Sequence, residues 1–159
     1  TSGISIIAKH YLSAGILADY MRDRQIKREY TAIVEGIVES DSDVIDMPIA
    51  RVDESVITRE VNYDNGERAV THYRVIKRDT INNVSLVKLT LDTGRTPQIR
   101  VHMKAIGHPL IGDFLYNPEN TQMKRQALHA GHISFIHPIT GERMEFVTEL
   151  PDDMKWIEE

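Results

Sequence analysis

The segment 91–113, which reads LDTGRTPQIRVHMKAIGHPLIGD, holds the side chains of this sequence that are best suited to chemistry. It places two guanidiniums and two imidazoles among glycine turns and carboxylates, beside a short amphipathic run. Simple packing does not require such a mixture. An arginine can bind a carboxylate or a phosphate through two parallel hydrogen bonds. The segment therefore predicts a loop that grips a phosphorylated or carboxylated partner.

Arg100 is the residue of this segment that most needs an anion beside it. The spacing of Ile99, Met103 and Ile106 predicts a helix over 98–106, so Arg100 lies at its start, directly after the turn 94–97. A cation is disfavoured near the positive N-terminal end of a helix dipole. The alternatives are an anion in a functional site and a structural salt bridge to another acid of the domain.

Other polar residues of the segment have two possible roles each. Arg95, Thr96 and Gln98 are expected either to bind backbone phosphate or to satisfy the turn. His102 is a further candidate for substrate contact, although its place one helical half-turn from Arg100 favours a structural role. Asp113 follows Gly112 and is expected to cap a turn.

Several common kinds of active site are not expected. His129 and His132 have a metal-like spacing, but in a strand they would point to opposite faces, and no cysteine completes a zinc site. The stretch 94–96 lacks the lysine of a nucleotide-hydrolase phosphate loop, and no serine lies in a nucleophile elbow. The sequence therefore predicts no metal site.

The composition allows one domain of 159 residues with its own core. No apolar run approaches the length of a membrane span, and the absence of cysteine is compatible with a reducing cytosol. The net charge of −5 argues against a strongly basic, non-specific nucleic-acid binder, so an RNA partner would need positive charge gathered on one face. Candidates for that face are Arg22, Arg24, Lys27, Arg28, Arg95, Arg100, Lys104, Lys124 and Arg125.

The pattern of apolar residues and turns predicts an α+β domain rather than a doubly wound parallel sheet. Asp64–Glu67 is typical of a tight hairpin turn that leads into a return strand at 69–77, because Asn-Gly tolerates positive φ angles. A second turn at 80–83 precedes a buried strand at 84–91. The pattern predicts strands at 3–8, 29–35, 44–52, 57–63, 69–77, 84–91, 129–135 and 143–147, and helices at 11–24, 98–106 and 151–156.

Four stretches of the sequence, in order, resemble the RluA family of RNA pseudouridine synthases. TGRTPQIRVH followed by GHPLIGD is similar to the third signature motif of that family, with Pro97 in place of a common histidine. The other three are TSGISIIAK at 1–9, REYTAIVEG at 28–36 and QALHAGHISFIHPITGERMEF at 126–146. The resemblance implies a mixed, mostly antiparallel central sheet with flanking helices and a central cleft.

The resemblance also implies an activity and roles for single residues. It implies a cytoplasmic isomerase that converts uridine to pseudouridine in structured ribosomal or transfer RNA, without a cofactor because the change is redox-neutral. Tyr30, which by itself reads as a half-buried core aromatic, would lie against the target uracil. Arg100 would pair with the catalytic aspartate. Arg28, in place of a more usual lysine, would contact substrate, together with Arg95, Thr96, Gln98 and His102.

The family's essential aspartate belongs to a His-Arg-Leu-Asp-x-x lead-in that ends in Thr-Ser-Gly, and here the match begins at Thr1. We therefore expect residues 1–159 to form an N-terminally incomplete catalytic domain, inactive alone and prone to self-association at an uncovered sheet edge. One alternative is a non-catalytic RNA-binding protein derived from this fold. A second is a generic α+β interaction domain.

Overall fold

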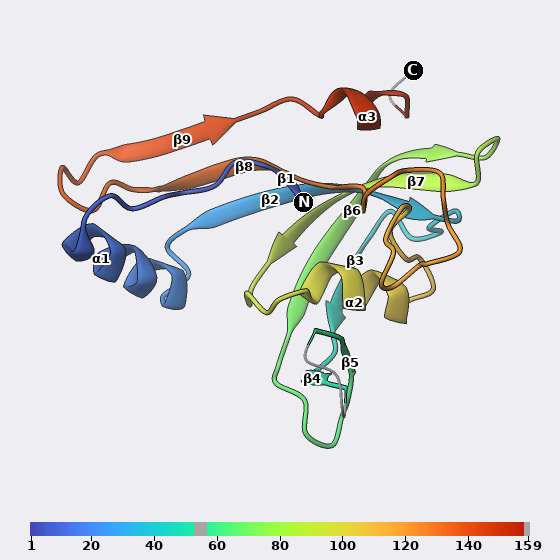
Figure 1. The fold of residues 1–159 in the computed structure, drawn as a ribbon, viewed down its shortest axis with the longest axis horizontal. Helices are drawn as coiled ribbons and strands as arrows, with labels where there is room; N and C mark the ends of the chain where they lie inside the picture. The colour runs from blue at the N-terminus through green and yellow to red at the C-terminus, as the bar shows by residue number, and fades with distance from the viewer. Residues whose placement is uncertain (53–56, 158–159) are drawn as a thin grey trace.

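A mixed sheet forms the centre of the computed structural model, which describes residues 1–52 and 57–157 (Figure 1). Its order is β1-β8-β2-β7-β6-β3, with β9 beside β8, and only β1 and β8 pair in parallel. The strands are β1 (Ser2–Gly3), β2 (Lys27–Glu35), β3 (Ser42–Asp46), β6 (Val70–Asp79), β7 (Val84–Leu91), β8 (Leu128–Ile136) and β9 (Arg143–Val147).

The remaining elements lie around this sheet. A small second sheet pairs β4 (Ile49–Arg51) with β5 (Arg59–Val61). The helices of the described residues are α1 (Tyr11–Arg22), α2 (Gln98–Ala105) and α3 (Asp152–Lys155). None of these helices has the length and apolar character that crossing a bilayer would require. The fold class predicted from the sequence, an α+β domain around a mixed and mostly antiparallel sheet, is confirmed.

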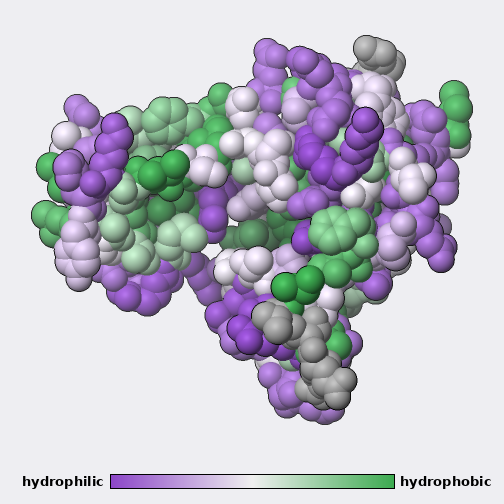
Figure 2. Space-filling model, viewed as in Figure 1, coloured by the Kyte–Doolittle hydropathy of each residue, from purple (hydrophilic) through white to green (hydrophobic). Residues whose placement is uncertain are grey.

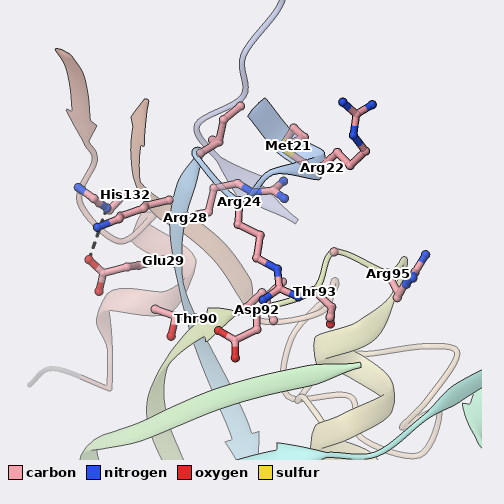
Figure 3. A pocket seen from close by; sticks show the side chains of 14 residues that line it. Met21, Arg22, Arg24, Arg28, Glu29, Thr90, Asp92, Thr93, Arg95 and His132 are labelled. Carbon is pink, nitrogen blue, oxygen red and sulfur yellow. Dashed lines mark ion pairs between the residues drawn. The ribbon is translucent and has the colours of Figure 1, made fainter. Parts of the chain in front are cut away.

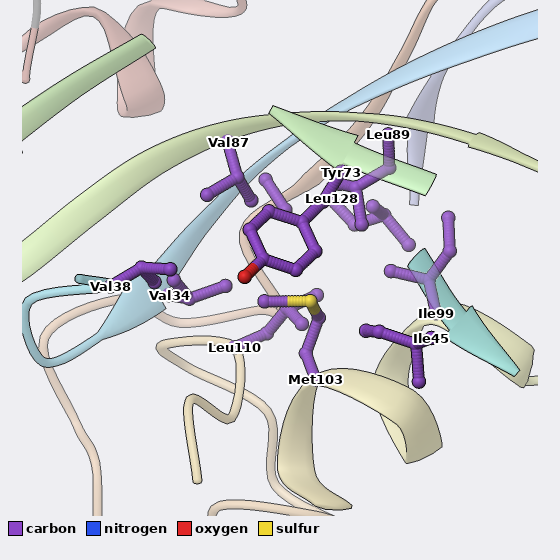
Figure 4. Close-up of a cluster of buried hydrophobic side chains, with 11 residues drawn as sticks. Val34, Val38, Ile45, Tyr73, Val87, Leu89, Ile99, Met103, Leu110 and Leu128 are labelled. Atoms are coloured by element: carbon purple, nitrogen blue, oxygen red, sulfur yellow. The ribbon is translucent and has the colours of Figure 1, made fainter. Parts of the chain in front are cut away.

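Alternation along the central strands creates a core on each face of the sheet, because successive side chains of a strand point to opposite faces. On β2, Ala32 and Val34 face one cluster, whereas Ile33 faces the other. The first cluster also receives Ile99 and Met103 from α2, and Figure 4 shows these two side chains beside Leu89 and Val34. The second cluster is closed by α3 and the residues that follow it.

Helix α1 is an exception to this close packing. None of its residues is fully buried, and the side chains of Tyr11 and Leu12 are 96% and 64% exposed. In Figure 1 the helix lies to one side of the sheet, beneath β8 and β9 in that view. The chain leaves the helix through Arg24, whose φ of 59° is in the left-handed region, and then enters β2. A hollow between α1 and the sheet follows from this loose packing.

Three sequence predictions about strands are wrong. The strand expected at 44–52 is divided between β3 and β4, which belong to different sheets. The strand expected at 3–8 is limited to Ser2–Gly3, because Gly3 adopts a φ of 111° and the chain leaves the sheet. The hairpin expected around Asn65 and Gly66 does not form, since β5 pairs with β4 while β6 pairs with β3 and β7. Neither Asn65 nor Gly66 has a positive φ, and the side chain of Asn62 accepts the N–H groups of the next turn instead.

The other predicted elements are confirmed within a few residues. The turn at 80–83 joins β6 to β7, with Asn83 at a φ of 53°, and β8 pairs with β9 over the predicted ranges. Helix α2 starts at the predicted residue. Strong local signals in the sequence therefore predicted most elements correctly. The wrong predictions concern how far a strand extends and which strands pair.

Replacement of Leu89 tests the assignment of the core. Leu89→Ala removes a completely buried side chain from the cluster beneath α2 and is expected to lower the free energy of unfolding by about 3 kcal/mol. The same substitution at the exposed Leu12 is the control and should change it by less than about 0.5 kcal/mol. Urea unfolding measures both, and equal losses would contradict this core.

Candidate functional site

Two adjoining cavities open between α1 and the sheet. The larger, called the basic pocket here, has a volume of about 720 Å³ and lies between the end of α1, the start of β2 and the loop 92–95. The smaller, called the apolar pocket, has about 550 Å³ and lies between residues 1–8, α1, β2 and β8. Met21, Ile26 and Arg28 line both, so the two cavities share a wall. Figure 2 shows the surface hollowed between the α1 side and the α2 side.

The acids of the basic pocket already have polar partners. The carboxylate of Glu29 lies 3.4 Å from His132 and 3.6 Å from Lys88. That of Asp92 lies 2.9 Å from the imidazole of His72. In Figure 3, Glu29 and His132 lie on one side of the cavity and Asp92 on the other. An anion that enters the pocket therefore meets few unpaired carboxylates.

The cations of the same pocket differ in whether they have an acidic partner. Arg22 pairs with Asp19, and Arg95 pairs with Glu67. By contrast, three basic side chains of the lining have no hydrogen bond or ion pair to any other residue that the structure describes, namely Arg24, Lys27 and Arg28. A chain with a net charge of −5 thus keeps unpaired positive charge in one cavity. Such a cavity suits an oxyanion or a phosphodiester.

Arg28 lies at the boundary between the cavities. It extends from β2 toward the loop 92–95, where its Nη2 lies 3.6 Å from the place that a Cβ on Gly94 would occupy. The side chain is half-buried and lines both the basic and the apolar pocket. Arg28 therefore belongs to the wall of both cavities and can bring a positive charge to a ligand there.

Tyr30 packs against the core and also borders a cavity. On β2 it lies opposite Leu89 of β7 and Ala130 of β8, next to an irregularity in the pairing with β8. The ring packs against the core cluster beneath α2 and also lines the apolar pocket. Its hydroxyl has no hydrogen-bond partner among the described residues. The ring can therefore form one wall for a flat, apolar group.

Arg100 forms a bidentate ion pair with Asp113. Its Nε and Nη2 donate to the two carboxylate oxygens, each at 2.6 Å, while Nη1 makes no hydrogen bond within the described residues. The guanidinium carbon also lies 4.8 Å from the centre of the Tyr116 ring. The structural salt bridge left open by the sequence is therefore present, and one edge of the guanidinium stays free for a second anion.

Asp113 is the residue of the site that the sequence did not connect with Arg100. Its side chain is fully buried, and Oδ1 also accepts the N–H groups of Leu115 and Tyr116, at 3.1 and 3.0 Å. Burial alone would raise the pKa of Asp113, but the hydrogen bonds from Arg100 and from these backbone groups, with the charge of Arg100, lower it. The expected turn cap is confirmed, and the same carboxylate holds Arg100.

The start of the chain connects Arg100 with the Tyr30 cavity. Thr1 lines the apolar pocket together with Tyr30, whereas Arg100 lines neither cavity. The guanidiniums of Arg125 and Arg100 both act electrostatically at Thr1, so the start of the described chain lies near two cations.

The remaining candidates differ in how accessible they are. Arg95 lines the basic pocket and Thr96 is exposed outside both cavities. Gln98 is 2% exposed. Its amide nitrogen donates to the Val70 carbonyl and the Thr71 hydroxyl, and its amide oxygen accepts from the Thr93 hydroxyl and the Arg95 N–H. Of the two alternatives for Gln98, this arrangement favours satisfying the turn.

His102, like Gln98, is buried inside the domain. Its two ring nitrogens lie 2.9 Å from the Thr71 hydroxyl and from the Met47 carbonyl. Burial lowers the pKa of His102, so the neutral imidazole is favoured. His102 therefore anchors α2 to β6 and to the chain after β3, and its burial favours the structural role.

The paired histidines of β8 have different surroundings. His129 Nδ1 lies 2.9 Å from the Ser2 hydroxyl, whereas His132 lies between Glu29 and Glu145. In residues 1–52 and 57–157, no group of three or more histidines, cysteines or acids could hold a metal ion.

Comparisons with known proteins agree with one another. The family model described as RNA pseudouridylate synthase matches residues 1–105. An uncharacterized RNA pseudouridine synthase of Bacillus subtilis is 46% identical over 97% of this chain and 53% of its own length. The ribosomal large subunit pseudouridine synthase D of Zymomonas mobilis is 42% identical over 99% of this chain and 52% of its own length. The chain thus spans about half the length of the curated relatives it matches.

A solved structure has the same fold. The human protein named RNA pseudouridylate synthase domain containing 1 superposes with a TM-score of 0.78 at 27% identity, over 89% of this chain and 62% of that one.

Removal of the Asp113 charge tests the buried pair. Asp113→Asn leaves the guanidinium of Arg100 without its counter-charge and is expected to lower the free energy of unfolding by about 3 kcal/mol at neutral pH. Asp41→Asn is the control, because Asp41 also lies 2.7 Å from an arginine but is 89% exposed, and it should cost less than about 1 kcal/mol.

The same pair predicts a pH dependence. Because the folded pKa of Asp113 is lowered, its contribution is complete above the unfolded value of about 3.9 and is lost as the pH falls through the folded pKa. Unfolding measured between about pH 5 and pH 2 should show a shallower loss for Asp113→Asn than for the unmodified chain. Parallel curves would contradict the assignment.

Proposed function

We propose a role in RNA modification for this chain, which belongs to the RluA family of RNA pseudouridine synthases. Residues 1–159 form most of a catalytic domain that isomerises uridine to pseudouridine. Ribosomal RNA is the proposed substrate, since a relative at 42% identity is named for the large ribosomal subunit. A cytoplasmic location is part of the proposal.

The observation that carries the proposal is the shared wall of the two cavities at Arg28. A base in a folded RNA must leave its stack to be modified, and its flanking phosphates must then be held. The apolar pocket offers the flipped uracil the ring of Tyr30 as one wall. The basic pocket offers the neighbouring phosphates Arg24, Lys27 and Arg28, none of which is neutralised within the described residues.

The catalytic aspartate is proposed to lie ahead of Thr1, outside these residues. The family places it in the lead-in to Thr-Ser-Gly, and Arg100 and Arg125 are cations that act electrostatically at Thr1. The free Nη1 edge of Arg100 is available for it. Two unit charges about 4 Å apart interact by roughly 4 kcal/mol at an effective dielectric near 20, before desolvation, which is enough to keep an acid ionised.

A second candidate is a non-catalytic RNA-binding protein. One observation favours it: the unpaired cations of the basic pocket suit the binding of a phosphate backbone. RNA binding is therefore common to both candidates, and turnover separates them.

The first test concerns RNA binding by the chain itself. Arg28→Ala removes a proposed phosphate contact, so the affinity for a ribosomal RNA fragment should fall and the slope of log K against log salt should shrink by about 0.7–0.9. Arg24→Ala and Lys27→Ala should act alike. Arg74→Ala is the control, because Arg74 is exposed and lines neither cavity. Filter binding at several salt concentrations gives both values, and an equal change with Arg74→Ala would contradict a phosphate site at the basic pocket.

The second test concerns turnover. Tritium release from ribosomal RNA labelled at carbon five of uridine should stay at background with residues 1–159, because positioning residues do not replace the group they position. Placing the family's His-Arg-Leu-Asp-x-x lead-in ahead of Thr1 should restore release, and Tyr30→Phe in that extended chain should reduce it. Release by the unextended chain would contradict the missing aspartate. No release by the extended chain would favour the RNA-binding alternative.

A further inference from the structure

Phe114 is an aromatic side chain that the core does not use. It is 72% exposed, in the turn between Asp113 and Tyr116, and lines neither cavity. The other phenylalanines of the chain are 9% and 43% exposed and stack on each other. Folding therefore buries only a small part of the apolar surface of this ring.

The turn that carries Phe114 is held rigidly. The buried carboxylate of Asp113 accepts the N–H groups of Leu115 and Tyr116, and the carbonyl of Asp113 accepts the N–H of Asn117 at 2.7 Å. Leu115 and Tyr116 pack inward against the cluster of Ile49 and Val101. Phe114 is therefore presented to solvent by a fixed backbone.

One cation lies over this exposed ring, and a second lies over a neighbouring ring. The guanidinium of Arg100 lies over Phe114, 6.0 Å from the ring centre, and its Nη1 has no partner among the described residues. On Tyr116, the next ring of the same cluster, the ammonium of Lys104 lies 5.8 Å from the centre. Lys104 is exposed and has no ion pair in the part of the chain that the structure describes. The Phe114 ring thus meets one cation and stays largely exposed to solvent.

We propose that Phe114 is a stacking platform for an RNA base outside the pocket that receives the target uridine, with Lys104 meeting the adjacent phosphate. Aromatic rings interleaved with cations bind unpaired nucleotides in this way, because every base has a π-face and every linkage a charge. The proposal rests on the RNA-binding function proposed above. It adds a contact on the α2 side, separate from the basic pocket near α1, so that two separate surfaces hold one RNA.

A variant series at position 114 tests this contact on the chain as it stands. The probe is a fluorescently labelled RNA hairpin with a uridine-containing loop. Phe114→Ala should weaken binding at least about fivefold, the lower end of what one base–aromatic stack contributes, without changing the salt slope. Phe114→Trp should keep the affinity, whereas Phe114→Leu should lose it. Phe146→Ala on β9 is the control for loss of a partly exposed phenylalanine.

A second probe removes the bases instead of the ring. On the same hairpin with an abasic loop, the unmodified chain and Phe114→Ala should bind equally. Unchanged binding by Phe114→Ala on the normal hairpin, or full affinity of Phe114→Leu, would overturn the stacking role and leave the RNA-binding function intact. Failure of the unmodified chain to bind either hairpin would overturn both proposals.

Discussion

The ion pair between Arg100 and Asp113 is the interaction on which the arrangement of the site depends. A fully buried carboxylate is costly unless its charge is compensated and its lone pairs are hydrogen-bonded. Asp113 meets both conditions through the guanidinium and two backbone N–H groups. The pair therefore joins α2 to the turn 113–117 and fixes the direction of the remaining guanidinium edge. The ring of Tyr116, whose hydroxyl accepts the N–H of Arg59, packs against the same guanidinium.

The basic pocket shows a second constraint, the distribution of charge. The chain has more acids than bases, yet Glu29 and Asp92 each have a basic partner, while Arg28 and its neighbouring cations remain available. Local pairing rather than net charge thus decides what the cavity attracts. The loose packing of α1 makes this possible, because a helix pressed against the sheet would close both pockets.

The sequence allowed correct prediction where the physical signal was local and strong. The apolar alternation of β2, β7 and β8 and the turn at Asn83 identified strands and a hairpin with small errors in their ends. The failures are non-local. The turn at Asn65 looked sufficient for a hairpin, but the strand after it gains more by pairing with both β3 and β7, and the strand before it pairs with β4. Which strands pair depends on how much apolar surface each pairing buries, and a turn motif carries no information about that.

The sequence by itself determined the family and the identity of the candidate residues Tyr30 and Arg100, because motif order and spacing are properties of the chain. Only the tertiary structure decided how these residues are used. It placed Gln98 and His102 inside the domain, put Arg28 between two cavities and supplied Asp113 as the partner of Arg100. The reason is that an arginine's requirement for an anion can be read from its local context, whereas which carboxylate is desolvated beside it depends on how distant segments pack.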